Sequence, residues 1–313
     1  MKATAVQFAE LAARLQPDDS ARSFTAGRLC RRNGEHQRAA IWYRRALRLA
    51  RIAGNHIDMA NARLGMGNLE SDLGNSASAE ANFLKAARAA LRNGRQSLAA
   101  AAFHNLIGVT YDSGRRDEAL DHLRKAASYY SPDHPRFPAF AYDAGFFLLR
   151  EGYFSSALTL FETVLPWVDG DRVSILVRSA LARSAAAVRD HIRYTRQATV
   201  VLAMVDVDDE DSADALYQLA EGARAFQQWD TADSLADRAM ALAEKRSDAR
   251  IASYSRALLQ AVRDRVPTED VDRVPPEADP VDLITQDVLR KLRKKPASPV
   301  AGGAVPPERY PTE

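Results

Sequence analysis

The chain has 313 residues, of which 46% are apolar and 27% are charged, so it can bury a sizeable core and does not have the composition of a disordered polypeptide. Its net charge of +2 gives no overall bias toward or away from nucleic acid. The single cysteine, Cys30, excludes an intrachain disulfide and is compatible with a reducing compartment.

Charge is distributed unevenly along the chain. Residues 1–100 carry 16 basic and 8 acidic side chains, whereas residues 201–313 carry 15 basic and 22 acidic ones. The two ends therefore differ in sign, with net charges of +8 and −7. Such a polar molecule can steer and orient a charged partner.

The beginning of the chain predicts a helix and no secretory signal. Gln7, Glu10 and Arg14 interrupt any apolar core in "MKATAVQFAELAARLQ". The most apolar run, residues 97–109, is too short to span a bilayer. We therefore expect a cytoplasmic protein without a membrane partner.

Three stretches repeat one pattern at a fixed pitch of forty residues. They begin at Gly34, Gly74 and Gly114 and read "GEHQRAAIWYRRAL", "GNSASAEANFLKAA" and "GRRDEALDHLRKAA". Apolar residues recur every three or four positions, which is the period of a helix. Each glycine marks the turn of a helical hairpin, and hairpins of this kind must stack to bury their apolar faces.

These residues resemble the tetratricopeptide repeat (TPR) family, including bacterial helical-repeat scaffold and adaptor proteins. The pattern has small residues and aromatic residues at fixed places in the two helices of a repeat. The matching positions of the first four copies are Gly27, Gly34, Ala39, Tyr43, Ala46, Gly67, Gly74, Ala79, Phe83, Ala86, Gly108, Tyr111, Gly114, Ala119, Ala126, Gly145, Gly152, Ala157 and Phe161. Two weaker copies follow, and in one of them Asp190 stands where the turn glycine is expected.

The resemblance implies an all-α fold, a right-handed α-solenoid of about six antiparallel helical hairpins. We expect residues 1–19 to form an N-terminal capping helix, residues 20–245 the repeat array, and residues 246–265 a C-terminal capping helix. The prolines in 131–138 predict an irregular joint within the array. In this family Cys30 faces the helix interface, which favours a buried and unreactive thiol.

The last 48 residues, 266–313, hold nine of the fourteen prolines and are expected to be disordered. One segment within them, 281–295, is predicted to form a short amphipathic helix with Val281, Ile284, Val288 and Leu292 on one side. Its basic end and the acidic residues 206–211 suggest transient docking on the C-terminal repeats. The alternative is that it recruits another protein.

No catalytic site is expected. The six histidines fall in different repeats, and neither a nucleophile elbow nor a phosphate-binding glycine loop is present. The sequence therefore predicts a protein without enzymatic activity, metal or cofactor.

In TPR proteins the first helices of the repeats line a groove that binds peptides. The resemblance transfers this role to a set of polar, basic and aromatic residues, whose amides and guanidinium groups suit a peptide backbone or a carboxylate. The candidate groove residues are Phe24, Arg28, Arg31, Arg32, Asn61, Asn68, Asn105, Tyr142, Phe146, Arg150 and Tyr217.

The helix that begins near residue 36 carries five arginines, Arg38, Arg44, Arg45, Arg48 and Arg51. At helical spacing they are expected to spread around the helix, and no aromatic residues alternate with them for base stacking. This pattern favours a solvated convex face and disfavours nucleic acid.

Three functions remain open from the sequence. The first is a scaffold or adaptor that binds a protein or peptide in its groove. The second is a regulatory subunit that senses a peptide and acts through a separate output protein, because residues 1–19 are too short for a DNA-binding helix-turn-helix. The third is an RNA-binding helical array.

Overall fold

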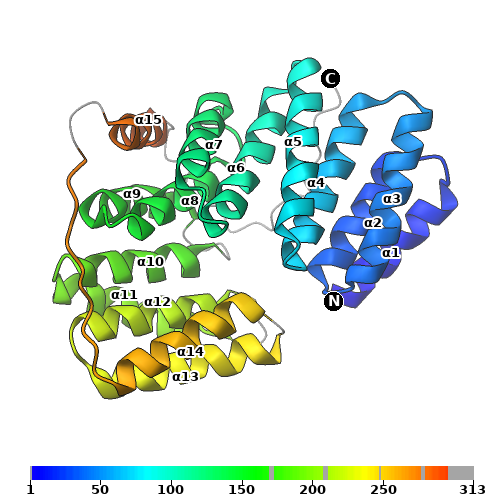
Figure 1. The fold of residues 1–313 in the computed structure, drawn as a ribbon. Helices are drawn as coiled ribbons and strands as arrows, with labels where there is room; N and C mark the ends of the chain where they lie inside the picture. Colours follow the sequence, from blue (N-terminus) through cyan, green and yellow to red (C-terminus); the bar gives the residue numbers. More distant parts are fainter. Residues whose placement is uncertain (1, 169–172, 207–210, 247, 276–278, 295–313) are drawn as a thin grey trace. The chain divides into compact units, whose positions relative to one another are not determined.

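The computed structural model describes residues 2–168, 173–206, 211–246, 248–275 and 279–294. Over these residues the chain consists of helices, turns and extended segments without β-strands, which confirms the predicted all-α class (Figure 1). Contacts divide the chain into two compact units, residues 1–134 and 135–313. The boundary lies within the proline-containing segment 131–138.

Unit 1 consists of three hairpins preceded by one helix. Its helices are α1 (Lys2–Leu15), α2 (Ser20–Arg32), α3 (His36–Ile52), α4 (His56–Asp72), α5 (Ser76–Arg92), α6 (Gln96–Asp112) and α7 (Arg116–Tyr129). The helices α2, α4 and α6 are the first helices of their hairpins, and each contacts the next one. The second helices, α3, α5 and α7, form the other layer.

Unit 2 continues the same plan with three further hairpins, followed by two single helices. Its helices are α8 (Phe137–Arg150), α9 (Phe154–Val168), α10 (Ser174–Ala187), α11 (His191–Met204), α12 (Ser212–Ala225), α13 (Trp229–Lys245), α14 (Ala249–Arg263) and α15 (Pro280–Lys294). Here α8, α10, α12 and α14 are in contact one after another. The described parts of the two units therefore contain the six hairpins that the repeat pattern predicts.

Small residues let the helix backbones approach closely, as the repeat predicts. Ala39, Ala79 and Ala119 are fully buried at equivalent places. Aromatic rings fill the remaining space against glycines. A Cβ added to Gly27 would lie 2.8 Å from Tyr43, and one added to Gly145 would lie 2.7 Å from Phe161. The glycines thus make room for rings that join one helix to its neighbour.

In the third repeat, the residues of the first helix that face the helix interface are shifted by one position from those expected. An added Cβ at Gly108 would meet no atom within 4 Å, whereas one at Gly67 would overlap the ring of Phe83. Gly67 lies seven residues before its turn glycine, and the residue seven before Gly114 is the buried Ile107. For the same reason Thr110 is fully buried in place of Tyr111. The smaller Leu123 replaces the ring here, so a glycine is not required.

Residues 266–275 form an extended strap along one edge of unit 2, and the strap leads to α15 (Figure 1). The guanidinium of Arg224 donates to the carbonyl of Val266 at 2.8 Å. Further along, the amide of Arg273 donates to the carbonyl of Gly152 at 2.8 Å, and Asp272 accepts from the amide of Ser155 at 3.0 Å. The final part of the expected tail, 295–313, lies outside the described residues.

Helix α15 packs against α9 and α8. The apolar stripe predicted from its sequence is the buried side, with Val281, Ile284, Val288 and Leu292 at most 6% exposed. We expected this segment to dock near the acidic residues 206–211, but the structure places it on the first hairpin of unit 2. The strap contacts with the α8–α9 turn explain the difference, because they fix the chain close to that hairpin.

Candidate functional site

The first helices of the hairpins carry the residues that the sequence assigns to a binding groove. We call the exposed side of α2, α4 and α6 the unit 1 inner face, and that of α8, α10, α12 and α14 the unit 2 inner face.

On the unit 1 inner face, polar side chains link one helix to the next. Arg31 of α2 binds Asp72 of α4 at 2.8 Å. Asn105 of α6 donates its amide to the side-chain oxygen of Asn68 of α4 at 2.6 Å. Part of the hydrogen-bonding capacity expected for a ligand is therefore used to hold the inner helices together.

Arg31 is fixed further by Tyr43. Burial lowers the pKa of Arg31, but Asp72 and the hydroxyl of Tyr43 outweigh that effect, and the net pKa is raised. Burial also raises the pKa of Tyr43 to about 12. Arg31 is consequently a charged structural group that joins two helices, in addition to any role toward a ligand.

Asn61 differs from these residues. Its side chain is 8% exposed, and its Oδ1 atom is buried without a hydrogen-bond partner among the described residues. Asn61 precedes Asn68 by two helical turns and therefore lies on the same side of α4. A buried amide oxygen without a donor is costly, but this atom is closed to solvent, so an incoming peptide cannot reach it in this conformation.

The other candidates of unit 1 belong to α2 itself. Phe24 is half-buried and contacts the ring of Tyr43 at 5.8 Å between centroids. Arg28 is half-buried and Arg32 is exposed, and both take part in interactions within the protein. Phe24 thus belongs partly to the core that includes Ala26, Ala39 and Tyr43.

On the unit 2 inner face, aromatic side chains come in two pairs. Tyr142 and Phe146 of α8 stack with a centroid distance of 6.0 Å. Tyr217 of α12 and Tyr254 of α14 are 5.9 Å apart. Tyr142 and Phe146 were predicted from the sequence, as was Tyr217. Tyr254 was not, because its helix was assigned to a cap.

Acidic side chains from two helices lie near the first aromatic pair. Burial raises the pKa of Tyr142 well above its ordinary value, and Asp214 of α12, Asp143 and Asp211 raise it further, while Arg250 of α14 lowers it. Side chains of α8, α12 and α14 therefore share one electrostatic environment. The two aromatic pairs, which come from α8, α12 and α14, are the main geometric feature of the unit 2 inner face.

The second aromatic pair has an acidic neighbour as well. The hydroxyl of Tyr217 donates to Glu221 at 3.0 Å, and burial together with this carboxylate raises the pKa of Tyr217. Gln218 joins Arg183 of α10 at 2.9 Å and Asp214 at 2.9 Å. Arg150, also predicted for the groove, is exposed at the end of α8 and has an interaction within the protein.

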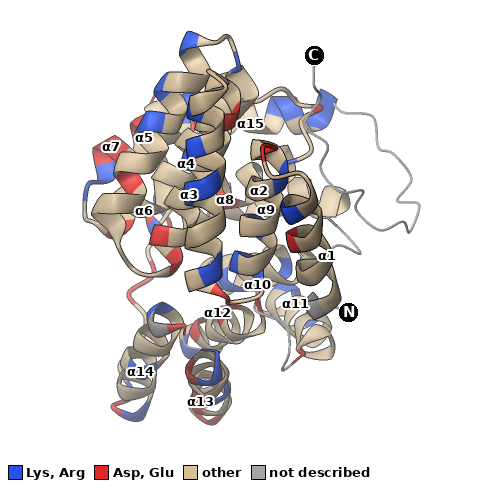
Figure 2. Cartoon of the chain, turned by 90° about the vertical axis from the view of Figure 1, so that its right-hand side faces the viewer, with Lys and Arg blue, Asp and Glu red and all other residues tan. Residues whose placement is uncertain are grey.

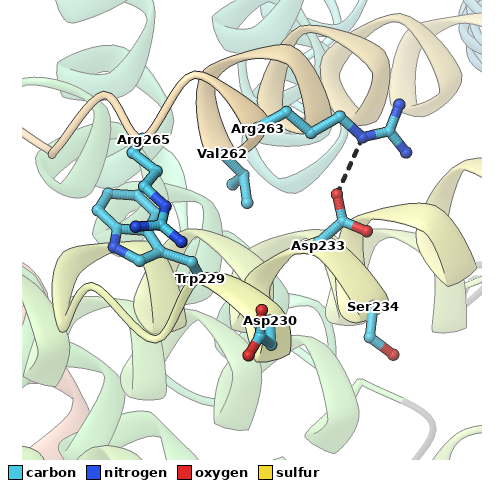
Figure 3. Close-up of a pocket in the computed structure, with 7 residues that line it drawn as sticks. All are labelled: Trp229, Asp230, Asp233, Ser234, Val262, Arg263 and Arg265. Carbon is cyan, nitrogen blue, oxygen red and sulfur yellow. Dashed lines mark hydrogen bonds and ion pairs between the residues drawn. The ribbon is translucent and has the colours of Figure 1, made fainter.

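A cavity of about 370 Å³ opens between α13 and α14, away from the first helices of the hairpins (Figure 3). Its lining includes Trp229, Val262 and Arg265, and an ion pair of 3.0 Å joins Arg263 to Asp233 at one side. The opposite charges compensate each other within the wall. We therefore regard the inner faces as the better candidates for a binding site.

The described residues contain no group of three or more histidine, cysteine or acidic side chains placed to hold a metal ion. None of their helices combines the length and the apolar character that crossing a bilayer requires.

Comparisons with known proteins agree with this architecture. Residues 26–56 match a family model described as tetratricopeptide repeat. PilF of Pseudomonas aeruginosa is similar in structure, with a TM-score of 0.52 and 18% identity over 78% of this chain and 96% of that one. BtubC from P. vanneervenii has a TM-score of 0.37 and 16% identity over 79% and 91% of the two chains. No curated protein matches the sequence.

The stacked hairpins and their glycine–aromatic contacts define a helical-repeat protein. Within this class, residues 26–56 match the tetratricopeptide repeat family, and the chain shares its helical-repeat fold with PilF. This fold serves in general as a scaffold for protein interaction.

Proposed function

We propose that the protein is a non-enzymatic scaffold that binds an extended segment of a partner protein on the inner faces of its repeats. The observation that supports this function best is that aromatic side chains of three helices lie on the unit 2 inner face. Phe146 of α8 stacks on Tyr142, and Tyr217 of α12 contacts Tyr254 of α14. A surface built from several repeats suits an extended ligand.

The chemistry of the unit 2 inner face favours a segment that combines apolar and basic side chains. Half-buried Phe146 and Tyr217 offer ring surface to apolar groups. Asp214 and Glu221 offer carboxylates to a lysine or an arginine.

The proposal can be tested by selection from a displayed library of random peptides with the full-length protein. We expect enriched sequences with basic and apolar residues, bound with micromolar affinity. Removing the carboxylates by Asp214→Asn and Glu221→Gln should weaken the selected peptides about tenfold, in line with the loss of charge-assisted hydrogen bonds.

The control is Asp237→Asn, which removes an exposed carboxylate from the second-layer helix α13. It should leave binding unchanged. Selection of peptides without a common pattern, or equal effects of all three substitutions, would contradict the proposal. Specific selection of RNA in a parallel experiment would favour the RNA-binding alternative.

A further inference from the structure

The outward side of α3 carries a row of cations without partners. Arg44, Arg48 and Arg51 are exposed and follow one another at intervals of four and three residues. The described residues provide no ion pair or hydrogen bond for any of these three side chains. The sequence suggested that the arginines of this helix spread around it, but these three lie on one side, because their spacing matches the helical repeat.

The next second-layer helix, α5, continues this row. Lys85, Arg88 and Arg92 are exposed along its outward side. Arg88 follows Arg48 by one repeat of forty residues, so these two cations occupy equivalent places. The only acidic residue within the two helices is Glu80, which binds Arg115 at 2.5 Å. We call the outward side of α3 and α5 the basic face; Figure 2 shows the blue segments on these helices.

Crowding of positive charge is also evident at the edge of this face. Burial lowers the pKa of Arg63 on α4, and the nearby positive charge of Arg51 lowers it further. Uncompensated cations at this spacing repel one another, since their charges are of like sign. An anionic partner would relieve that repulsion.

The basic face also exposes aliphatic side chains. Ile41 is 62% exposed and Ile52 is 75% exposed, and both lie on the same side of α3 as Arg48. The aromatic residues of α3 and α5, in contrast, are buried: Trp42, Tyr43 and Phe83 are at most 6% exposed. The face therefore offers cations and aliphatic groups without rings for base stacking.

The third second-layer helix does not share this character. On α7, Asp121 stands where α3 has Ile41, and it binds Arg124 at 2.7 Å and Lys125 at 2.5 Å. The cations of α7 are thus compensated by their own helix. The basic face is confined to α3 and α5.

We propose that the basic face binds the surface of an anionic lipid bilayer. Its arginines and lysine contact the headgroup phosphates, and Ile41 and Ile52 enter the boundary between headgroups and acyl chains. Exposed aliphatic side chains favour a lipid surface over nucleic acid, which would gain more from aromatic stacking. The sequence did not favour a membrane partner because no segment could span a bilayer, but a surface contact needs no spanning segment.

Sedimentation of the full-length protein with vesicles tests this proposal. The vesicles contain phosphatidylcholine alone or with 30 mol% phosphatidylglycerol, at about 0.1 M salt. We expect binding only to the anionic vesicles. The variant R44Q/R48Q/R51Q should bind about 100-fold more weakly, since each cation near the surface contributes about fivefold.

A matched variant, R196Q/R238Q/R293Q, removes the same number of charges from exposed positions of α11, α13 and α15. It should bind like the unchanged protein, and circular dichroism should show that all variants keep their helical content. If both triple variants lose binding equally, net charge alone is responsible and the proposal is wrong.

The aliphatic residues distinguish a bilayer from other polyanions. Ile41→Ser with Ile52→Ser should weaken vesicle binding at least tenfold and leave binding to heparin unchanged. A protein that ignores anionic vesicles but binds single-stranded or duplex RNA through Arg44, Arg48 and Arg51 would overturn the proposal and assign the face to nucleic acid.

Discussion

The turns between helices are built with the same hydrogen bond in both units but with different residues. In unit 1 the turns after α2, α3, α4, α5 and α6 each contain a glycine with positive φ, and these glycines recur every twenty residues at Gly34, Gly54, Gly74, Gly94 and Gly114. In unit 2 the same conformation is taken by Gly152, Arg189, Gln227 and Arg265. Unit 2 thus places side chains where they cost conformational energy.

The hydrogen bonds show that the turn itself is unchanged. The amide of Asn55 donates to the carbonyl of Ala50 at 2.9 Å in unit 1, and that of Gln228 donates to Ala223 at 3.0 Å in unit 2. Both are the bond that closes a helix through a left-handed residue. The packing of the hairpin therefore determines the left-handed conformation of the turn residue. Glycine lowers the energetic cost of this conformation but is not required for it.

The ends of the units differ as well. Helix α1 in unit 1 is fixed through Glu10, which is 6% exposed and accepts from the indole of Trp42 at 2.8 Å and from Arg38. Helix α15 in unit 2 is fixed through an apolar stripe. Helix α1 thus adds a buried charge to the apolar contacts of Val6 and Ala13, whereas α15 is held by its apolar stripe, so the two ends should respond differently to substitution.

The largest effect is expected at the apolar end. Val288 is fully buried in α15, and Val288→Asp would place a charge without a partner against α9. We expect α15 to detach, at a cost of about 3–4 kcal/mol. Hydrogen exchange should then become faster in α15 and in residues 154–168, while unit 1 stays unchanged.

The control is Leu283→Asp, because Leu283 is 55% exposed on the other side of the same helix. It should leave the exchange of α9 unaffected. Equal protection of α9 in all three proteins would show that α15 is not held by its apolar stripe.

At the charged end, Glu10→Ala should release α1 with a loss of about 2 kcal/mol, since it leaves the indole of Trp42 without its acceptor. Cys30 reports this change, because it is the only cysteine and its thiol lies against Glu10 at 3.6 Å. Burial and Glu10 raise the pKa of Cys30 to about 11, so labelling at pH 8 is slow in the unchanged protein. The variant should react faster.

Acid should weaken the same end. Burial raises the pKa of Glu10, but its bonds to Trp42 and Arg38 outweigh burial, and the net pKa is lowered. A carboxyl with a lowered pKa contributes stability above its unfolded pKa, and this contribution is lost as pH falls through the folded value. Protection of α1 should decrease below about pH 4. Protection of α1 that stays constant down to about pH 3 would contradict this role of Glu10.

The glycine–aromatic contacts allow one substitution to be compared at two places. At Gly67 an added Cβ overlaps Phe83, so Gly67→Ala should destabilise unit 1 by about 1–3 kcal/mol. At Gly108 the Cβ meets no atom, so Gly108→Ala should stabilise the helix by about 0.5–1 kcal/mol. Native-state exchange or urea unfolding measures both, and effects of the same sign would refute this assignment of the register.

These glycines also show how far the sequence predicts the structure. The hairpins and their count follow from Gly34, Gly74 and Gly114, because helix termination leaves a regular signal. The shift at Gly108 is visible in the sequence, because Gly108 lies six residues before Gly114 whereas Gly67 lies seven residues before Gly74. In unit 2 the turn of α10 was placed at Asp190, which instead caps α11 by accepting from Arg193, and the left-handed residue is Arg189.

The contacts of the candidate site were less predictable. Asn68 and Asn105 were expected to line a groove, but periodicity does not reveal that they bind each other. The strap was not predicted because the bond between Arg273 and Gly152 joins backbone atoms 121 residues apart and leaves no pattern in the sequence. Tyr254 was missed because a helix at the end of an array was assumed to serve only as a cap.

The smallest effect is expected at the turns, and it tests the first comparison directly. Gly94 and Gln227 both have positive φ, at 67° and 57°. A Cβ at Gly94 would meet no atom within 4 Å, so Gly94→Gln changes only the backbone preference and should cost about 1 kcal/mol. The reverse substitution, Gln227→Gly, relieves the backbone strain and should stabilise unit 2. The gain should be only about 0.5 kcal/mol, because the greater freedom of glycine in the unfolded chain offsets part of it.

Arg189→Gly serves as the contrasting case. The guanidinium of Arg189 donates to the carbonyl of Ala225, whereas the described residues show no hydrogen bond from the side chain of Gln227. Relief of backbone strain at Arg189 should therefore be offset by the lost hydrogen bond, leaving the stability of unit 2 nearly unchanged. Urea midpoints of the three variants and the unchanged protein give the comparison. If Gln227→Gly and Arg189→Gly stabilise unit 2 equally, the hydrogen bond of the Arg189 side chain does not contribute to its stability. Arg189 would then be a strained residue without compensation at a place where unit 1 has glycine.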